Sequence, residues 1–157
     1  MTGRNEVRRL QRKLDAAFDR ARQVTDDEVR SDLARHLCIL VSGWFEKSVA
    51  ELLLNFSRSS PKPVVTYVEN SLRWLTNVRK DRLLDTLGAF DARWRDEFDR
   101  FVVDEYEAAL NSVVALRNDI AHGGAASISF ATISAYYGRI EEIVDRLSDR
   151  LDPPPRV

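Results

Sequence analysis

Apolar residues recur at helical spacing along almost the whole chain, and this periodicity limits the folds that the chain can adopt. The pattern is clearest over residues 4–23, 25–56 and 130–151. Apolar residues three and four positions apart lie on one face of a helix, whereas a half-buried strand needs alternating apolar and polar residues. The sequence therefore predicts an all-α protein with at least five helices and no sheet of more than two short strands.

The two N-terminal segments predict two long helices. The segment 4–23 carries its apolar residues on one side: Val7, Leu10, Leu14, Ala17, Phe18 and Ala21. Thr25-Asp26-Asp27-Glu28 then offers a helix cap with acids in the first turn. The middle of the second helix, residues 37–41, is apolar all round. We therefore expect the helix over 25–56 to be central and covered on several sides.

Four side chains of this second helix have competing interpretations. We expect Trp44 in the core. Glu46 is either a helper near an active cleft or, as we prefer, a solvated helix carboxylate. His36 and Cys38 are two positions apart and point to different faces of a helix, so a metal site there is disfavoured. Both are predicted to be ordinary core or boundary residues.

The rest of the chain predicts shorter helices and one long closing helix. Residues 57–63 are a loop by composition. Short helices are expected over 64–75, 81–90 and 92–102; residues 64–68 also suit a strand, but no second strand candidate exists to pair with it. The last helix, about 130–151, ends before Pro153, since prolines cannot continue a helix. We expect one domain over 1–152 and a Pro-rich tail over 153–157.

Composition and charge exclude several classes of protein. A chain of 157 residues can bury roughly 70% of its unfolded surface without metals or disulfides. Cys38 is the single cysteine, so no intrachain disulfide or cysteine zinc cluster is possible. No signal peptide or membrane-length apolar run is evident, which predicts a cytoplasmic protein without a membrane partner. The net charge of −1 gives no overall attraction to nucleic acid, although residues 1–24 hold seven basic and three acidic side chains. Such a band is usually a solvated helix face, but it could guide a phosphate backbone.

One segment, Arg117-Asn118-Asp119-Ile120-Ala121-His122, carries more chemistry than a helical core requires. It ends a helical segment that starts near residue 104 and is followed by Gly123-Gly124, which supply the left-handed residue that commonly ends a helix. An apolar stripe should face the core: Tyr106, Ala109, Leu110, Val113, Leu116 and Ile120. A second row is small and polar: Asn111, Ala115, Asn118 and His122.

Arg117 lies one step round the helix from Asn118 and is long enough to bend toward His122. An imidazole, a guanidinium and an amide together at a helix end suit phosphate chemistry. The alternative is a capping histidine with a surface arginine, because the chain holds 20 arginines and short motifs arise by chance.

The spacing Arg117-Asn118-x-x-x-His122 resembles the R-x4-6-H signature of the HEPN superfamily, in which a polar residue commonly follows the arginine. The chain is most similar to the RiboL-PSP-HEPN branch, through Trp44-Phe45-Glu46, Trp74, the helix with Trp94 and Phe98, and Ala121-His122-Gly123. The resemblance covers most of the chain. It implies a HEPN-like helical bundle with two long N-terminal helices, short middle helices and a long closing helix.

No P-loop, Rossmann, nucleophile-elbow or zinc pattern is present, and the acids are scattered along helix surfaces, so a two-metal nuclease has little support. The resemblance instead implies metal-free cleavage of RNA. His122 would take a proton from a ribose 2′-hydroxyl or protonate the leaving 5′-oxygen. Arg117 would clamp the scissile phosphate, and Asn118 would orient His122 or bond the phosphate. Asp119 is expected to be a surface or helix-pairing residue. We expect no metal and no cofactor.

The resemblance also implies partners. HEPN ribonucleases commonly dimerise with the motifs of two chains facing one cleft, which predicts a homodimer with a composite active site, an RNA substrate, and a role in toxin–antitoxin systems or antiviral defence. A cognate antitoxin or defence partner would follow. Some HEPN toxins carry a modifiable tyrosine two residues after the histidine, where this chain has Gly124. The alternative is a non-catalytic HEPN module that binds RNA, nucleotide or a protein partner.

Overall fold

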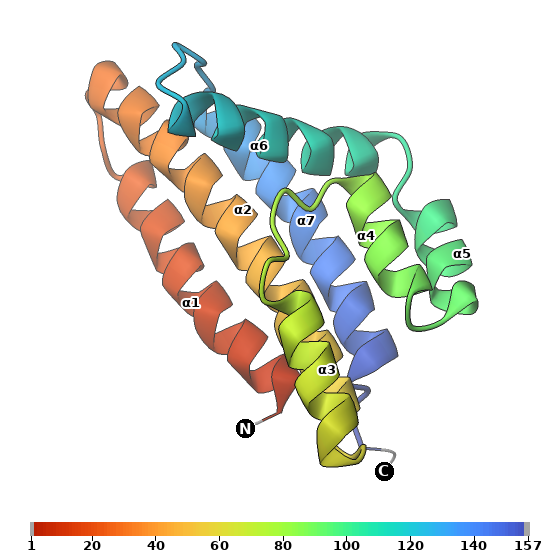
Figure 1. Cartoon of the computed structure of the whole chain (residues 1–157). Coiled ribbons are helices and arrows are strands. Elements are labelled where there is room, and N and C mark those ends of the chain that lie inside the picture. Colours follow the sequence, from red (N-terminus) through yellow and green to blue (C-terminus); the bar gives the residue numbers. More distant parts are fainter. Residues whose placement is uncertain (1, 156–157) are drawn as a thin grey trace.

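Seven α-helices build the part of the protein that the computed structural model describes, residues 2–155 (Figure 1). They are α1 (Gly3–Arg22), α2 (Asp27–Ser57), α3 (Lys62–Leu72), α4 (Lys80–Gly88), α5 (Ala92–Phe101), α6 (Glu105–Ala121) and α7 (Phe130–Leu151). No strand occurs over residues 2–155, and the all-α prediction is confirmed. Met1 and the last two residues of the predicted tail, 156 and 157, lie outside the described residues. The division into a domain over 1–152 and a tail stays a prediction.

The long helices α1, α2 and α7 lie side by side along the molecule, with the two chain ends at the same end of the bundle (Figure 1). α1 begins and ends close to its predicted bounds because its buried residues fall on one face: Gly3, Val7, Gln11, Leu14, Phe18 and Ala21. The Arg4 backbone N–H donates to Asp152 Oδ2 at 2.9 Å, and its guanidinium pairs with Asp149 at 2.7 Å. These contacts tie the start of α1 to the end of α7.

α2 is the central helix, as predicted, and packs against α1, α3, α6 and α7. Its start is capped by the Asp26 side chain, which accepts from the Val29 N–H at 3.0 Å. Trp44 is buried, and its indole N–H donates to the Val7 carbonyl at 3.3 Å. Cys38 is buried as expected, whereas His36 is exposed. The prediction that His36 is a core or boundary residue was therefore wrong.

α3, α4 and α5 are the short middle helices. α3 starts at Lys62, inside the segment predicted as a loop, because Pro63 sits in the first turn, where a proline N–H would be unpaired anyway. The strand considered for residues 64–68 is helical instead. α4 and α5 pack on each other, and Glu97 of α5 pairs with Arg146 and Arg150 of α7 at 3.3 and 2.6 Å.

α6 crosses the bundle and packs on both α2 and α7 (Figure 1). Because two helices cover it at once, its buried strip is wider than the predicted stripe: Ala109, Leu110, Val113 and Val114 are buried. Leu116 and Ile120 are only partly buried, so coverage decreases toward the motif. No helix within residues 2–155 combines the length and hydropathy of a membrane span.

Candidate functional site

The glycine pair ends α6 as the sequence predicts. His122 is the residue after the helix, and its backbone N–H donates to the Asn118 carbonyl at 3.0 Å. Gly123 has φ +76°, a backbone conformation that favours glycine. The Gly124 N–H donates to the Asp119 carbonyl at 2.8 Å. A Cβ on Gly124 would lie 2.8 Å from that same oxygen, so both glycines hold His122 at the helix end.

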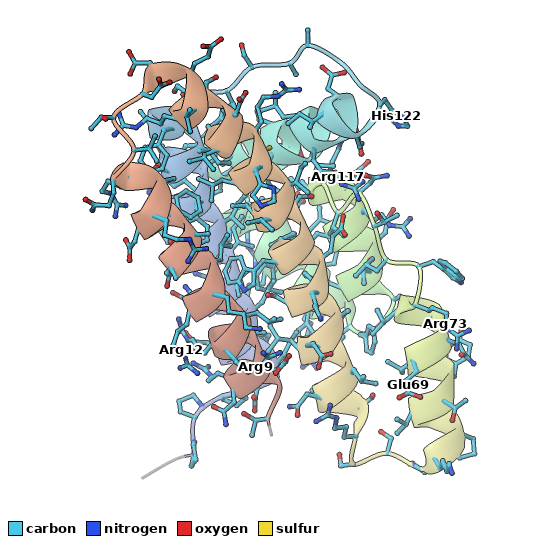
Figure 2. The ribbon with its side chains drawn as sticks, turned by 90° about the vertical axis from the view of Figure 1, so that its left-hand side faces the viewer. Arg9, Arg12, Glu69, Arg73, Arg117 and His122 are labelled. Carbon is cyan, nitrogen blue, oxygen red and sulfur yellow. The ribbon has the colours of Figure 1, made fainter. Side chains whose placement is uncertain are left out.

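His122 stands exposed at this end of the molecule (Figure 2). Its imidazole makes no hydrogen bond or ion pair with any other residue in the described part of the chain. It lines a shallow hollow of about 650 Å³ on the outer face of α6, and the other lining residues are Arg79, Ser112, Ala115, Leu116, Asn118, Asp119 and Tyr136. An imidazole placed in this way can exchange protons with a bound molecule.

The Arg117 guanidinium is bound only by neutral amide oxygens. Its Nη1 donates to Asn118 Oδ1 at 3.2 Å and to Asn77 Oδ1 at 3.4 Å. No carboxylate within residues 2–155 forms an ion pair with it. The guanidinium has five N–H donors, so most of its donors and all of its charge remain available. This is an arrangement that can receive an anion.

The structure does not bring Arg117 and His122 to one point within the chain. Five positions along an α-helix correspond to about 140° of rotation, and Arg117 does not line the hollow that His122 lines. Arg117 turns toward Asn77 instead of bending toward His122. Asn118 joins the two, because it bonds Arg117 and lines the hollow. Figure 2 shows Arg117 and His122 at the same end of the molecule.

The loop before α4 contributes residues that the sequence did not reveal. Asn77 has φ +53°, and its N–H donates to Glu46 Oε1 at 2.9 Å. The Thr76 hydroxyl donates to the same oxygen at 3.4 Å. Glu46 is half-buried, and its carboxylate oxygen holds the loop through these two exposed hydrogen bonds, so it has a structural task that the interpretation as a solvated helix carboxylate did not include. The one available signal was that asparagine tolerates positive φ.

The residues of the predicted small polar row have two different surroundings: Asn111 bonds the start of α4, whereas Ala115, Asn118 and His122 line the hollow. The Asn111 Oδ1 accepts from the Lys80 backbone N–H at 3.0 Å, and this bond caps the start of α4. Ala115 and His122 are exposed. Asp119 is exposed, as expected for a surface residue. Arg79 was missed by sequence reasoning; it is exposed beside the hollow and has no ion pair within the described residues.

No group of three His, Cys, Asp or Glu side chains comes together over residues 2–155 in a way that could hold a metal ion. The candidate site itself offers a guanidinium, an amide and an imidazole at the end of one helix. All three predicted site residues, Arg117, Asn118 and His122, lie on this turn or directly after it.

The family comparison covers nearly all of the described residues. The model of the RiboL-PSP-HEPN family matches residues 4–152, from the first turn of α1 to the end of α7. No curated protein and no solved structure matches the chain. The matched segment includes all seven helices and the Arg117–His122 motif. The chain therefore belongs to the RiboL-PSP-HEPN family.

Proposed function

We propose that the protein is a metal-independent endoribonuclease of HEPN type. The observation that carries the proposal is the state of Arg117: its charge is not neutralised, because two amide oxygens hold it, and it lies near an exposed histidine. Within residues 2–155, nine arginines, among them Arg4 and Arg150, form ion pairs with carboxylates at 2.6–3.4 Å. An arginine kept apart from carboxylates suits a phosphate ligand.

The proposed reaction needs only groups of the motif and of the RNA. A neutral His122 takes the proton of a ribose 2′-hydroxyl while the 2′-oxygen attacks the adjacent phosphorus. The bond from phosphorus to the 5′-oxygen breaks, and the protonated form of His122 supplies the proton to that oxygen. The products are a 2′,3′-cyclic phosphate and a 5′-hydroxyl. Arg117 stabilises the charge that develops on the phosphate oxygens.

Asn118 has a role that its contacts make specific. Its side-chain oxygen is occupied by Arg117 at 3.2 Å, which leaves its amide N–H groups as donors toward the hollow. In this proposal Asn118 positions Arg117 and donates to the phosphate. This role agrees with its place between the two ionisable residues.

The active site is proposed to form between two copies of the chain. Arg117 and His122 are about 140° apart around α6, so one chain offers them in different directions. The exposed Ala115 and His122 leave the outer face of α6 accessible. Approach of two such faces across a two-fold axis would place the motifs of both chains in one cleft. HEPN domains commonly dimerise, which supports the same arrangement.

The biological setting that we propose is a toxin–antitoxin system or antiviral defence, with a cognate antitoxin or defence partner that restrains cleavage. Membership of the HEPN family supports this proposal. The second candidate function is a non-catalytic HEPN module that binds RNA, nucleotide or a protein partner. The observation in its favour is that Arg117 and His122 diverge within one chain.

The test is cleavage of total RNA by the purified protein, with and without EDTA. We expect RNA to be cut and matched DNA to stay intact, equally with chelator, with 2′,3′-cyclic phosphate or 3′-phosphate ends. His122→Ala should lower the rate about 10²-fold or more, and Arg117→Ala at least as much. Arg100→Ala is the matched control, because Arg100 is an exposed arginine of α5 without an ion pair within residues 2–155.

All variants should keep the helical circular-dichroism spectrum of the wild type, since the replaced side chains lie outside the core. A folded His122→Ala protein that cuts RNA at the wild-type rate would contradict the nuclease proposal and favour the binding module.

A further inference from the structure

Trp74 is an indole that the fold leaves in solvent. It follows α3, and its side chain is 77% exposed, more than any other large hydrophobic side chain in the described part of the chain. None of the aromatic ring contacts within residues 2–155 involves it. The other two tryptophans are used in packing: Trp44 is buried, and Trp94 packs against Phe56 at 4.9 Å between ring centroids. A single exposed apolar side chain is not by itself an interaction site, so the groups around Trp74 decide whether it can hold a ligand.

The surroundings of Trp74 are basic and unpaired. Arg73, Arg79 and Arg82 are exposed, and none of them forms an ion pair within the described residues. The Arg73 guanidinium donates only to Asn70 Oδ1 at 3.1 Å. Four carboxylates lie nearby. Glu69 and Asp81 are exposed, Asp85 is paired with Arg95 at 2.8 Å, and Glu46 accepts from the Asn77 N–H at 2.9 Å. None of these carboxylates pairs with the three arginines, so their guanidinium groups remain available to an anionic ligand.

A hollow of about 620 Å³ runs beside this segment. Its lining includes Leu72 and Leu75, which lie on either side of Arg73-Trp74 in the sequence, together with Asn77, Arg79 and Arg82. Two of these residues connect it to the motif. Asn77 bonds the Arg117 guanidinium at 3.4 Å, and Arg79 also lines the hollow of His122. In Figure 2, Arg73 lies on the same side as Arg117 and His122, whereas Arg9 and Arg12 lie on the opposite side.

We propose that residues 73–82 form a subsite for single-stranded RNA, in which Trp74 stacks on an unpaired base and Arg73, Arg79 and Arg82 contact the flanking phosphates. The proposal rests on the proposed function, and it assigns how the strand is held beside the motif. Stacking on an aromatic ring needs an exposed base face, and arginines along the groove follow the backbone. A base-paired strand buries its base faces, so the subsite selects unpaired segments.

The unpaired arginines decide between RNA and a protein partner. An interface that buries Trp74 against protein would also desolvate three uncompensated guanidinium groups unless the partner were strongly acidic. A nucleic-acid strand supplies both the aromatic face and the regularly spaced anions. The observations therefore favour RNA, and a protein interface becomes an outcome of the test.

The test measures binding of a fluorescein-labelled 10-nucleotide RNA whose 2′-hydroxyls are methylated, so that it cannot be cut. Trp74→Ala should weaken binding of the single strand about tenfold, in line with the loss of one stacked base. The affinity for a duplex of the same length should stay within about twofold. Trp74→Phe, which keeps an aromatic face, should recover most of the affinity. Val29→Ala is the matched control, because Val29 is 48% exposed at the start of α2.

A second signal reports stacking directly. Binding of the oligonucleotide should quench part of the intrinsic tryptophan fluorescence of the wild type, and Trp74→Phe should abolish that quenching. Light scattering of Trp74→Ala should give the wild-type mass. Unchanged single-strand affinity in Trp74→Ala, or no binding by the wild type, would overturn the subsite. A changed mass would assign Trp74 to a protein interface instead.

The outcomes separate this inference from the proposed function. Trp74-dependent binding by a wild type that cuts no RNA would keep the subsite and remove the nuclease. Cleavage by the wild type with unchanged binding in Trp74→Ala would keep the nuclease and remove the subsite.

Discussion

At the scale of single residues, the neutral partners of Arg117 matter as much as the arginine. Asn77 and Asn118 fix the guanidinium through amide oxygens at 3.4 and 3.2 Å. Amides orient the side chain and leave its charge for a ligand, whereas a carboxylate at the same place would compete with the phosphate. Under the proposed function, the amide at position 77 is therefore expected to affect catalysis.

Replacement of Asn77 by aspartate tests this point. Aspartate is isosteric and tolerates the positive φ of this position, but it would form an ion pair with Arg117. We expect Asn77→Asp to lower the cleavage rate about tenfold, the scale of one lost charge interaction in a site. Asn5→Asp, at an exposed position of α1, should cleave RNA at the wild-type rate. Rates measured with a fluorogenic RNA would settle it, and an unimpaired Asn77→Asp would show that Arg117 does not need its charge.

Cys38 gives a residue-scale prediction about pH. Burial raises the pKa of its thiol to about 11, and its Sγ lies 3.5 Å from the Val113 carbonyl in the contact between α2 and α6. Only the thiolate reacts with disulfide reagents. At pH 8 the native thiol should react at least about 10²-fold more slowly than the thiol in denaturant, and its rate should rise about tenfold per pH unit up to the raised pKa. Equal rates before and after denaturation would place Cys38 outside the core.

At the scale of elements, amphipathic periodicity allowed the sequence to predict most of the helices. The bounds of α1, α2 and α7 follow from local spacing and caps, so they were predicted closely. α3 was predicted to start two residues late, because Pro63 reads as a loop residue unless its place in a first turn is known. Val114 was missed on α6, since its burial depends on two helices that pack there from distant parts of the chain.

The end of α6 is the element on which the site depends. A Cβ at Gly124 would meet the Asp119 carbonyl oxygen at 2.8 Å, so Gly124→Ala must displace the turn that holds His122. We expect the melting temperature of Gly124→Ala to fall by about 2–4 °C, which corresponds to about 1 kcal/mol for a domain of this size. We also expect it to lose RNA-cleaving activity at temperatures where it is still folded. Gly43→Ala should do the opposite: Gly43 is inside α2 and a Cβ there meets nothing within 4 Å, so alanine should stabilise the helix. Thermal unfolding of the two variants compares them directly.

At the scale of the whole molecule, the candidate site could be predicted only in part. The three motif residues are within six positions of one another, so their spacing predicted Arg117, Asn118 and His122. Asn77 bonds Arg117, which is 40 positions away, and Glu46, which is 31 positions away. Nothing in the sequence around Glu46 or Asn77 indicates these contacts. The direction of Arg117 also depends on this loop, which is why the expected bend toward His122 was not found.

Arg117 and His122 point in different directions on one chain, and this leads to a prediction about assembly. We expect a homodimer whose interface includes the outer face of α6, where Ala115 and His122 are exposed. Light scattering at tens of micromolar, a concentration above ordinary dimer dissociation constants, should give twice the mass of the 18.0 kDa chain. A monomer under these conditions would contradict the composite site.

Complementation between two inactive variants tests whether the chains share the site. If Arg117 of one chain serves His122 of the other, a heterodimer of Arg117→Ala and His122→Ala chains contains one complete pair, although each homodimer contains none. Random mixing makes about half of the dimers heterodimers. Each heterodimer holds one intact Arg117–His122 pair, whereas a wild-type dimer holds two. The mixture should therefore recover roughly a quarter of the wild-type rate. The chains would be mixed in denaturant, refolded together and assayed beside each refolded variant alone. Pairing within a single chain predicts a mixture as inactive as its components, because no chain would then carry both groups.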